Sequence, residues 1–515
     1  MTQERFAARI LLTPRPNRPK TVALEVAFLG HCPGRVNVDR LLAMPTLLDE
    51  LERVGFGDHV RQLQSGVAQE PLASLSHLPI PIYSRAEFHD LFPSALNGRT
   101  QYQSVLAGGR PWLAPCVDDF FANGGVKLWV VKIPEDERQA GFFPTEQTQL
   151  HDVQTLRGLA TLFILPRIGT VACPDLERLQ IPAQLPDVPR VRLANPDPQF
   201  RPCAQVYNQV TQDNHRERRH SNELPDAPDP LPFSDVLKGL LQRSAKARPD
   251  WQWVLSLPLS YAPVAENAAQ SPQVDPTATE WLEQLKQRND AHRLRQLQLV
   301  FPYLRAPDRP LRSSVGIITG KQAAMAQREG IWVSVAEAPL VASARPFPHL
   351  SLSQALDLRH APGVSVLRFH RGALRLDDER LCVPALPPED INTGLNDRRY
   401  GGYRSAEVQR FLGYLQRSLR ALGEQLIFNV DYRDPRPRLI LDTFFRNLYQ
   451  RGALRGRTVD EAFHIQPHLP ASNESGDGVM VFEIAIAPAL PIERIRLTFS
   501  NARGAWKTSG GTGDV

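Results

Sequence analysis

Segments with helical spacing alternate with strand-like segments along the first third of the chain, and this order limits the possible folds more than any other feature. Residues 83–92 and 114–121 have the apolar spacing of helices, and Ser84 stands where an N-terminal cap is expected. Residues 126–133, VKLWVVKI, have the composition of a buried strand. A further helix and strand follow before residue 173. Such alternation predicts an α/β layer with a largely parallel sheet.

The last third of the chain has a different pattern. Residues 405–422 and 436–451 each carry one apolar stripe with arginines beside it, so we expect two half-buried helices. Residues 479–487 and 494–499 are expected strands, and the second alternates apolar with polar side chains. Residues 501–515 are rich in Gly, Ser and Thr, which predicts a flexible tail. The C-terminal third is therefore predicted to be an α+β unit.

Prolines mark the middle of the chain. Many of the 46 prolines gather between residues 182 and 276, where they exclude long helices because proline lacks an N–H donor and restrains the residue before it. Residues 233–243 and 279–300 have helical periodicity between the proline clusters. We therefore expect an outward-facing, proline-rich insertion over about residues 180–290.

Composition narrows the class of protein. With 515 residues, 42% of them apolar, the chain can bury two or three cores. Its uninterrupted apolar runs are all shorter than the roughly 18–20 residues needed to cross a bilayer, so we expect assembly in the cytoplasm without direct membrane insertion. The net charge of +5 indicates an acidic partner, but no nucleic-acid recognition motif accompanies it. The five cysteines are scattered singly, as buried apolar residues are.

Patterns that imitate functional sites have simpler structural explanations. Gly316 to Gln322 resembles a phosphate-binding loop, but it has one residue too few between its glycines and lacks the Ser or Thr that binds magnesium. His464 and His468 have metal-ligand spacing on a helix, but Pro467 makes a helix there improbable. No catalytic triad or carboxylate pair stands out in the sequence. We therefore predict no enzymatic activity, no cofactor and no metal.

A series of short motifs, in one order from about residue 80 to residue 500, resembles the phage tail sheath protein family. Phe121, Asn123, Gly124 and Gly125 before the strand LWVVKI resemble its FF-x-NGG motif, and Pro174-Asp175 resembles its P-D step. Later positions resemble its GAL-x-G, AF and AP motifs, namely Gly452, Ala453, Leu454, Gly456, Ala462, Phe463, Ala487 and Pro488. The chain departs from the family pattern at Arg494, where the family has Phe, and in its short N-terminal extension.

The resemblance implies a particular division of the chain. The expected fold class is α/β, or α+β overall, with an α/β outer sheath domain and a C-terminal α+β inner domain with terminal strand-exchange arms. Residues 1–24 would be the N-terminal arm, 25–345 the outer domain, 346–500 the inner domain facing a tube, and 501–515 the tail.

The resemblance also implies a function. The chain would be a structural subunit of the contractile sheath around the inner tube of a phage-tail-like contractile injection system, stacked on copies of itself as a helix of six-membered rings. Its partners would be the inner tube protein, other sheath paralogues, baseplate and cap proteins. Whether the finished particle is virion-like, extracellular or anchored stays open. The alternatives are a low-copy sheath-like subunit near the cap or baseplate, and, from another class, a cytoplasmic α/β enzyme.

Two sets of residues follow from this resemblance. Subunit strand exchange would use Ala7, Arg9, Ile10, Leu11 and Leu12 near the N-terminus and Arg494, Ile495, Arg496, Leu497, Thr498 and Phe499 near the C-terminus. Contact with an acidic tube surface would use the basic rim of the C-terminal helices, namely Arg410, Arg417, Arg420, Arg438, Arg446, Arg451 and Arg455. Exchanged strands suit a moving lattice because main-chain pairing is strict in geometry yet connected by linkers.

Overall fold

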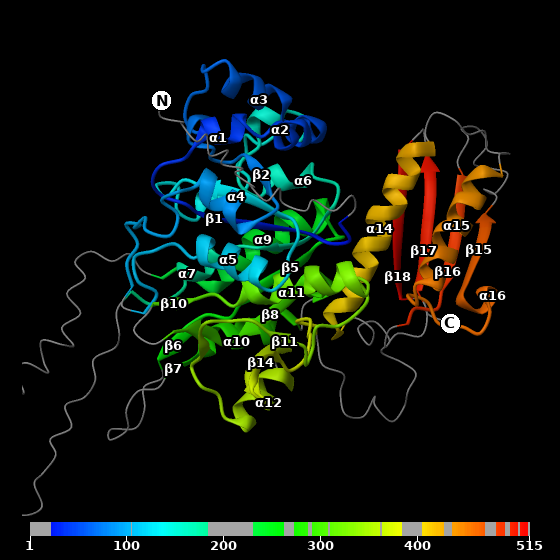
Figure 1. Cartoon of the computed structure of the whole chain (residues 1–515). Coiled ribbons are helices and arrows are strands. Elements are labelled where there is room, and N and C mark those ends of the chain that lie inside the picture. The colour runs from blue at the N-terminus through cyan, green and yellow to red at the C-terminus, as the bar shows by residue number, and fades with distance from the viewer. Residues whose placement is uncertain are drawn as a thin grey trace, which may run out of the picture.

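The computed structural model of this chain shows an α/β body and a smaller helix-and-sheet unit, connected by the long helix α14 (Ala406–Leu426) (Figure 1). The structure describes residues 22–104, 106–183, 230–261, 272–286, 291–306, 310–360, 363–383, 404–426, 435–468, 480–489, 495–502 and 505–512. Among these residues, no helix is both long enough and apolar enough to span a membrane.

A nine-stranded sheet forms the centre of the α/β body, in the order β11-β14-β13-β8-β5-β4-β1-β3-β2. Its inner strands β13, β8, β5, β4, β1 and β3 run parallel, and antiparallel strands complete both edges. The strands are β1 (Glu25–His31), β2 (Pro79–Ile82), β3 (Leu128–Ile133), β4 (Ile168–Ala172), β5 (Gln252–Ser256), β8 (Leu297–Phe301), β11 (Pro339–Leu340), β13 (Val364–His370) and β14 (Ala373–Leu376). Most residues of the inner strands are buried and apolar on both faces, as in a parallel sheet that is covered on both sides.

Helices and short strands surround this sheet. The helices and turns of the body are α1 (Val38–Leu42), α2 (Pro45–Leu51), η1 (Glu52–Phe56), α3 (Gly57–Gln64), η2 (Leu72–Ser74), α4 (Arg85–Leu91), α5 (Leu113–Ala122), η3 (Ala140–Phe142), η4 (Val153–Thr155), α6 (Ala160–Phe163), α7 (Pro174–Arg178), α9 (Phe233–Ala247), α10 (Pro276–Lys286), η5 (Ala291–Gln296), α11 (Val315–Arg328) and α12 (Leu352–His360). The small sheets contain β9 (Tyr303–Arg305), β10 (Leu311–Arg312) and β12 (Arg345–Phe347), and β6 (Leu259–Tyr261) and β7 (Pro272–Val274).

The glycines of the apparent phosphate loop serve helix packing. Gly316 and Gly320 lie one turn apart on α11, which packs against α5. A Cβ atom at Gly316 would come within 2.5 Å of the Cys116 carbonyl oxygen, and one at Gly320 within 2.3 Å of the Phe120 carbonyl oxygen. Only glycine allows the two helix backbones to approach this closely. The geometry therefore supports helix packing, and not phosphate binding, as the reason for these two glycines.

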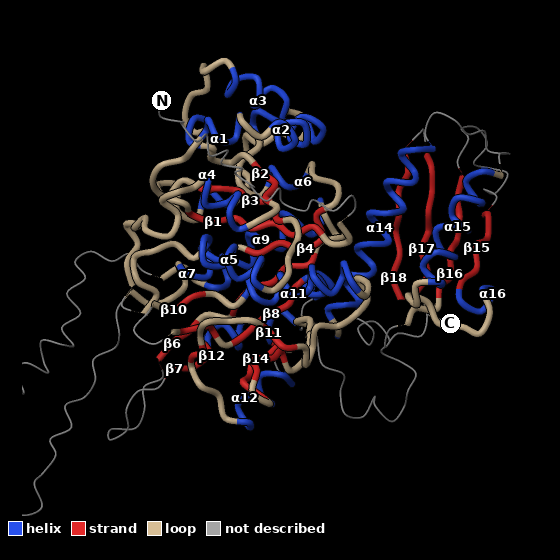
Figure 2. Tube along the Cα trace, viewed as in Figure 1, coloured by secondary structure: helices blue, strands red, loops and turns tan. Residues whose placement is uncertain are grey.

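The C-terminal unit is a four-stranded antiparallel sheet with two helices of three or more turns, drawn apart from the large sheet in Figure 2. Its strands are β15 (Phe463–His468), β16 (Met480–Ile486), β17 (Ile495–Ala502) and β18 (Ala505–Thr512), with the helices α15 (Arg436–Gln450) and α16 (Val459–Ala462). Helix α14 contacts β18 on one side and β4 and β5 of the large sheet on the other. The same helix therefore belongs to the packing of both units.

The predicted α/β fold class is confirmed, and several helices and strands lie where the sequence places them. Ser84 caps α4 by accepting a hydrogen bond from the Glu87 N–H at 3.1 Å. The helices expected at 405–422 and 436–451 are α14 and α15. The described cysteines Cys32, Cys116, Cys173 and Cys382 are buried, as expected of apolar residues.

Other boundaries differ from the predictions. The insertion expected over about 180–290 contains β5, a central strand of the sheet, so that prediction is wrong for residues 252–256; Trp253, Val254 and Leu255 are buried there between neighbouring strands. Residues 297–300, expected to be helical, belong to β8. Residues 505–512, expected to be a flexible tail, pair along their whole length with β17 as β18. The large sheet also includes residues 364–376, beyond the boundary expected at residue 345.

Candidate assembly site

The motif residues of the C-terminal third meet at one place, the turn after α15. Gly452 takes φ of +78°, the left-handed conformation that commonly ends a helix, and its N–H donates to the Tyr449 carbonyl at 2.9 Å. The next N–H, of Ala453, donates to the Leu448 carbonyl at 2.9 Å. Ala453 and Leu454 are then buried. The turn therefore directs two apolar residues into the hydrophobic core.

Three backbone hydrogen bonds attach the residues after β16 to this turn and to the end of α16. The Arg455 N–H donates to the Ala487 carbonyl at 2.8 Å, and the Ala487 N–H donates to the Ala462 carbonyl at 2.8 Å. The Ala489 N–H donates to the Ala453 carbonyl at 2.9 Å, beside a bridge between Leu454 and Pro488. The motifs therefore fix the point from which the chain continues to β17.

Strand β17 carries the described part of the predicted exchange segment. Leu497 and Phe499 are buried and lie opposite Ile484 and Phe482 of β16, so their predicted apolar face is confirmed. In this single chain β17 has β16 on one side and β18 on the other. Among the described strands of this sheet, β15 and β18 are the outer ones. Residues 7–12 and Arg494 lie outside the described residues, so strand exchange stays a prediction.

Two of the arginines predicted to face the tube are buried instead. Arg410 is 2% exposed and binds Glu379 through two contacts, 2.6 Å from Nη1 to Oε1 and 3.0 Å from Nη2 to Oε2. Arg417 is 8% exposed, and its Nη1 donates to the Asp250 carbonyl at 2.8 Å. The prediction of tube contact is wrong for these two residues because this side of α14 packs against the α/β body. They clamp the helix to the body.

The electrostatics of this clamp are those of paired buried ions. Burial alone would raise the pKa of Glu379, but the charge and hydrogen bonds of Arg410 hold that pKa below its ordinary value. Burial lowers the pKa of Arg417 to about 10, although Asp250 opposes the shift. The Arg417 guanidinium therefore keeps its charge at neutral pH. The low pKa of Glu379 depends on Arg410.

The remaining basic residues of the C-terminal helices are more accessible. Arg438 and Arg446 are exposed on α15, where Arg446 pairs with Asp442 one turn away. Arg451 is exposed with its guanidinium 5.5 Å from the Trp332 ring centre, Arg455 is exposed, and Arg420 is half-buried. These five arginines stay candidates for contact with an acidic partner.

The place where doubly wound folds hold an anionic ligand is filled by the chain itself. Strand order reverses between β1 and β4, and ligands of such folds bind at the carboxyl ends of the strands there, at a helix N-terminus. Here the Asp175 carboxylate accepts hydrogen bonds from the N–H groups of His31 at 2.9 Å, Trp112 at 2.8 Å and Leu113 at 3.2 Å. The last two groups belong to the start of α5.

Two neighbours complete this arrangement around Asp175. Arg178, fully buried, donates from Nε to Asp175 Oδ1 at 3.2 Å. A Cβ atom at Gly30 would lie 2.5 Å from Asp175 Oδ2, so glycine is required in β1. The sequence analysis identified Asp175 only as part of the P-D motif and did not predict that it accepts hydrogen bonds from the start of α5. The available signals were a Pro-Asp step after a buried strand and a glycine inside another strand.

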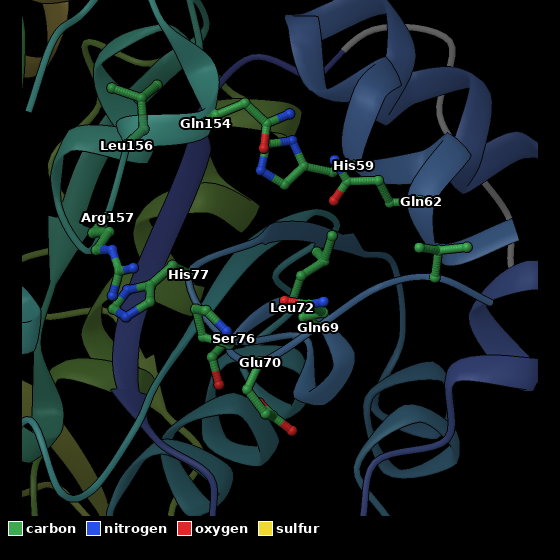
Figure 3. A pocket seen from close by; sticks show the side chains of 12 residues that line it. His59, Gln62, Gln69, Glu70, Leu72, Ser76, His77, Gln154, Leu156 and Arg157 are labelled. Carbon is green, nitrogen blue, oxygen red and sulfur yellow. The ribbon is translucent and has the colours of Figure 1, made fainter. Parts of the chain in front are cut away.

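A cavity of about 420 Å³ lies beside α3, lined by His59, Gln62, Val67, Gln69, Glu70, Pro71, Leu72, Ser76, His77, Gln154, Leu156 and Arg157 (Figure 3). The Ser76 hydroxyl lies 2.9 Å from the Ser74 hydroxyl, and both ring nitrogens of His77 have partners. A nucleophilic serine would need a hydrogen bond to the histidine ring, but the partners of the His77 ring are Glu137 and Gly158. In the described part of the chain, no cluster of three His, Cys, Asp or Glu residues can hold a metal ion.

Comparison with known proteins supports the same class of fold. A chain in the anti-feeding prophage (AFP) baseplate in the contracted state superposes with a TM-score of 0.52 at 17% identity, covering 96% of this chain and 97% of that one. A chain in the six-fold symmetrised AFP baseplate superposes with a TM-score of 0.51 at 14% identity, and the match covers 96% of this chain and 97% of that one. A chain in the PVC sheath complex of an extracellular contractile injection system, in the contracted state, has a TM-score of 0.47 at 12% identity. The match covers 95% of this chain and 94% of that one.

No protein-family profile matches this chain, and no curated protein matches it. The fold is thus a doubly wound α/β body carrying a helix-and-sheet unit, shared with chains of the AFP baseplate. At 14–17% identity this likeness shows a shared fold.

Proposed function

We propose that this chain is a structural subunit of the contractile sheath around the inner tube of a phage-tail-like contractile injection system. The observation that carries the proposal is the shared fold over 96% of the chain with chains of the AFP baseplate. The sequence motifs of tail sheath proteins support it, because those of the C-terminal third gather at one structural anchor. The proposed role is mechanical, and the Asp175 carboxylate at the start of α5, where ligands of doubly wound folds bind, supports it.

Copies of the chain would stack as six-membered rings and join through their C-terminal sheets. An outer strand has unpaired backbone groups and can accept a strand from a neighbour. Contacts of this kind join different surfaces of each subunit, so they do not close and extend as a helix. The turn around Gly452 would hold the base of the exchanged segment through the residues that follow β16. Assembly would take place in the cytoplasm, with baseplate and cap proteins at the ends.

Contact with the inner tube would use the accessible arginines of the C-terminal unit. Arg420, Arg438, Arg446, Arg451 and Arg455 offer positive charge to an acidic tube surface. An exposed ion pair is worth at most about 1 kcal/mol. Such weak contacts suit a sheath that must release its tube when it contracts.

Electron microscopy of the purified chain tests the main proposal. We expect rods or rings, alone or with the tube protein, because the contacts are open-ended. Labelled chain in whole particles should decorate their full length. A protein that stays monomeric at high concentration, with and without the tube protein, would contradict the proposal.

One observation favours a second candidate, a low-copy sheath-like subunit beside the baseplate. The two superpositions reported above with TM-scores of 0.51 and 0.52 are to structures of a baseplate. In that case the label would mark one end of each particle. The same imaging experiment therefore separates the two candidates.

Strand exchange can be tested with a reversible cross-link. Glu483 and Thr498 lie opposite each other on β16 and β17, on the face away from Leu497 and Phe499. We expect the double variant Glu483→Cys with Thr498→Cys to form rods when reduced and to stay unassembled when oxidised. The disulfide would hold β17 in its own sheet, so the reduced protein is the matched control. Equal assembly in both states would show that β17 is not exchanged.

A further inference from the structure

His77 connects three segments of the α/β body at the wall of the cavity in Figure 3. It is 5% exposed and has a left-handed backbone, with φ of +57°. Its N–H donates to the Lys132 carbonyl at 2.9 Å, next to the end of β3. Its ring Nδ1 accepts a hydrogen bond from the Gly158 N–H at 2.9 Å, and its Nε2 lies 3.0 Å from Glu137 Oε2.

These contacts require one form of the imidazole ring. The Gly158 N–H can only donate, so Nδ1 must be unprotonated. The single ring proton then lies on Nε2, where it is donated to Glu137. Uptake of a second proton would place an N–H group at Nδ1 against the Gly158 N–H. The contact with Gly158 would be lost, while the contact with Glu137 would remain.

Residues near Gly158 pack closely against the loop that follows β3. A Cβ atom at Gly158 would lie 2.3 Å from the Gly141 carbonyl oxygen, and the Leu159 N–H donates to the Phe142 carbonyl at 2.9 Å. Within residues 153–158 the chain forms the short turn η4. Thr155 forms hydrogen bonds with Gln149 and Asp152, Leu156 is buried and Arg157 lies 3.5 Å from Glu137. The His77 ring is one of the contacts that hold this segment against the rest of the body.

Charged groups on several sides act on His77. Burial lowers its pKa from the ordinary value of 6.5, and Arg157 acts in the same direction. Glu137 and Asp136, from the loop after β3, oppose this shift in pKa. Glu70 and His59 line the same cavity (Figure 3). The neutral ring is therefore the form that the folded protein prefers.

We propose that His77 is an acid-sensitive latch, whose imidazole releases residues 153–158 and opens the cavity wall when it takes up a proton. The latch contributes its full stabilisation of the closed segment above a pH of about 6.5, the pKa of a histidine in the unfolded chain. This stabilisation is lost as the pH falls through the lower pKa of His77 in the folded state. It is independent of the sheath assignment, because it depends only on contacts within the α/β body.

Hydrogen exchange of residues 153–160 at pH 7.5 and pH 5.0, corrected for the intrinsic rate, tests the latch in the full chain. We expect protection to fall at pH 5.0, up to about tenfold for each unit by which the folded pKa lies below 6.5. Glu137→Gln should move the midpoint to lower pH, and Arg157→Gln should move it to higher pH. A structural role alone would produce neither shift. Equal protection at both pH values in the unaltered protein would overturn the proposal.

Two variants and one spectrum complete the test. His77→Asn keeps an acceptor near the Nδ1 position, tolerates the left-handed backbone and does not titrate, so its protection should not depend on pH. His59→Asn, in the same cavity, is the matched control and should keep the full response. Nitrogen NMR of the histidine rings should show the His77 proton on Nε2 at pH 7.5. A proton on Nδ1, or an unchanged response in His77→Asn, would overturn the latch.

Discussion

Replacing Arg410 by methionine is expected to lower the free energy of unfolding by about 3–5 kcal/mol, because it leaves a buried carboxylate without its partner. Glu379 is fully buried, and besides Arg410 it accepts from Gln322 at 2.8 Å and from the Val335 N–H at 2.8 Å. These neutral donors cannot replace the lost positive charge. Urea denaturation followed by circular dichroism measures the change.

Two further variants give this prediction its controls. Arg438→Met removes an exposed arginine from α15 and should change stability by at most about 0.5 kcal/mol. Arg410→Met combined with Glu379→Gln removes both charges and should be more stable than Arg410→Met alone. If Arg410→Met and Arg438→Met were equally stable, Arg410 would not be part of a buried clamp.

Replacing Asp175 by alanine is expected to cost about 3–5 kcal/mol of stability, because Arg178 would be left as an unpaired buried charge. The N–H groups of Trp112, Leu113 and His31 would lose their acceptor in the same variant. Thermal and urea unfolding measure the loss. Asp58→Ala is the matched control, since its pair with Arg61 is exposed and is worth at most about 1 kcal/mol.

The Asp175→Ala variant also tests why the carboxylate is there. If Asp175 occupies an anion position at the start of α5, inorganic phosphate should raise the melting temperature of this variant more than chloride of equal ionic strength does. The unaltered protein should show only the general stabilisation that phosphate gives folded proteins, because its own carboxylate fills the position, so the variant should show the larger response. A variant as stable as the unaltered protein would mean that Asp175 has no such role.

Local patterns predicted the helices and strands whose cause is local. The stripe of Val408, Phe411, Leu412, Leu415, Leu419 and Leu422 predicted α14; the first five side chains are buried and Leu422 is half-buried. Ser84 predicted the start of α4, and Leu497 with Phe499 predicted the buried face of β17. A cap or an apolar stripe acts over one or two turns, so the sequence itself contains the whole signal.

Long-range pairing was not predictable in the same way. Strand β5 stands between proline-rich stretches and is held in place by β4 and β8. The glycines and serines of β18 favour a flexible tail, yet full pairing with β17 and contact with α14 order them as a strand. Strand formation depends on a partner that is distant in sequence, and composition does not identify that partner.

The sequence by itself determined the fold class, several helices and strands of the first and last thirds, and the motifs that resemble tail sheath proteins. Only the tertiary structure decided which arginines are available to a partner. Arg410 and Arg417 are arginines on the same helix as Arg420, but Glu379 and Asp250 approach them from the α/β body. The tertiary structure also placed Asp175 at the start of α5. The burial of the two arginines and the position of Asp175 both depend on residues that are distant in sequence and pack nearby in the fold. The local sequence around each position does not identify those residues.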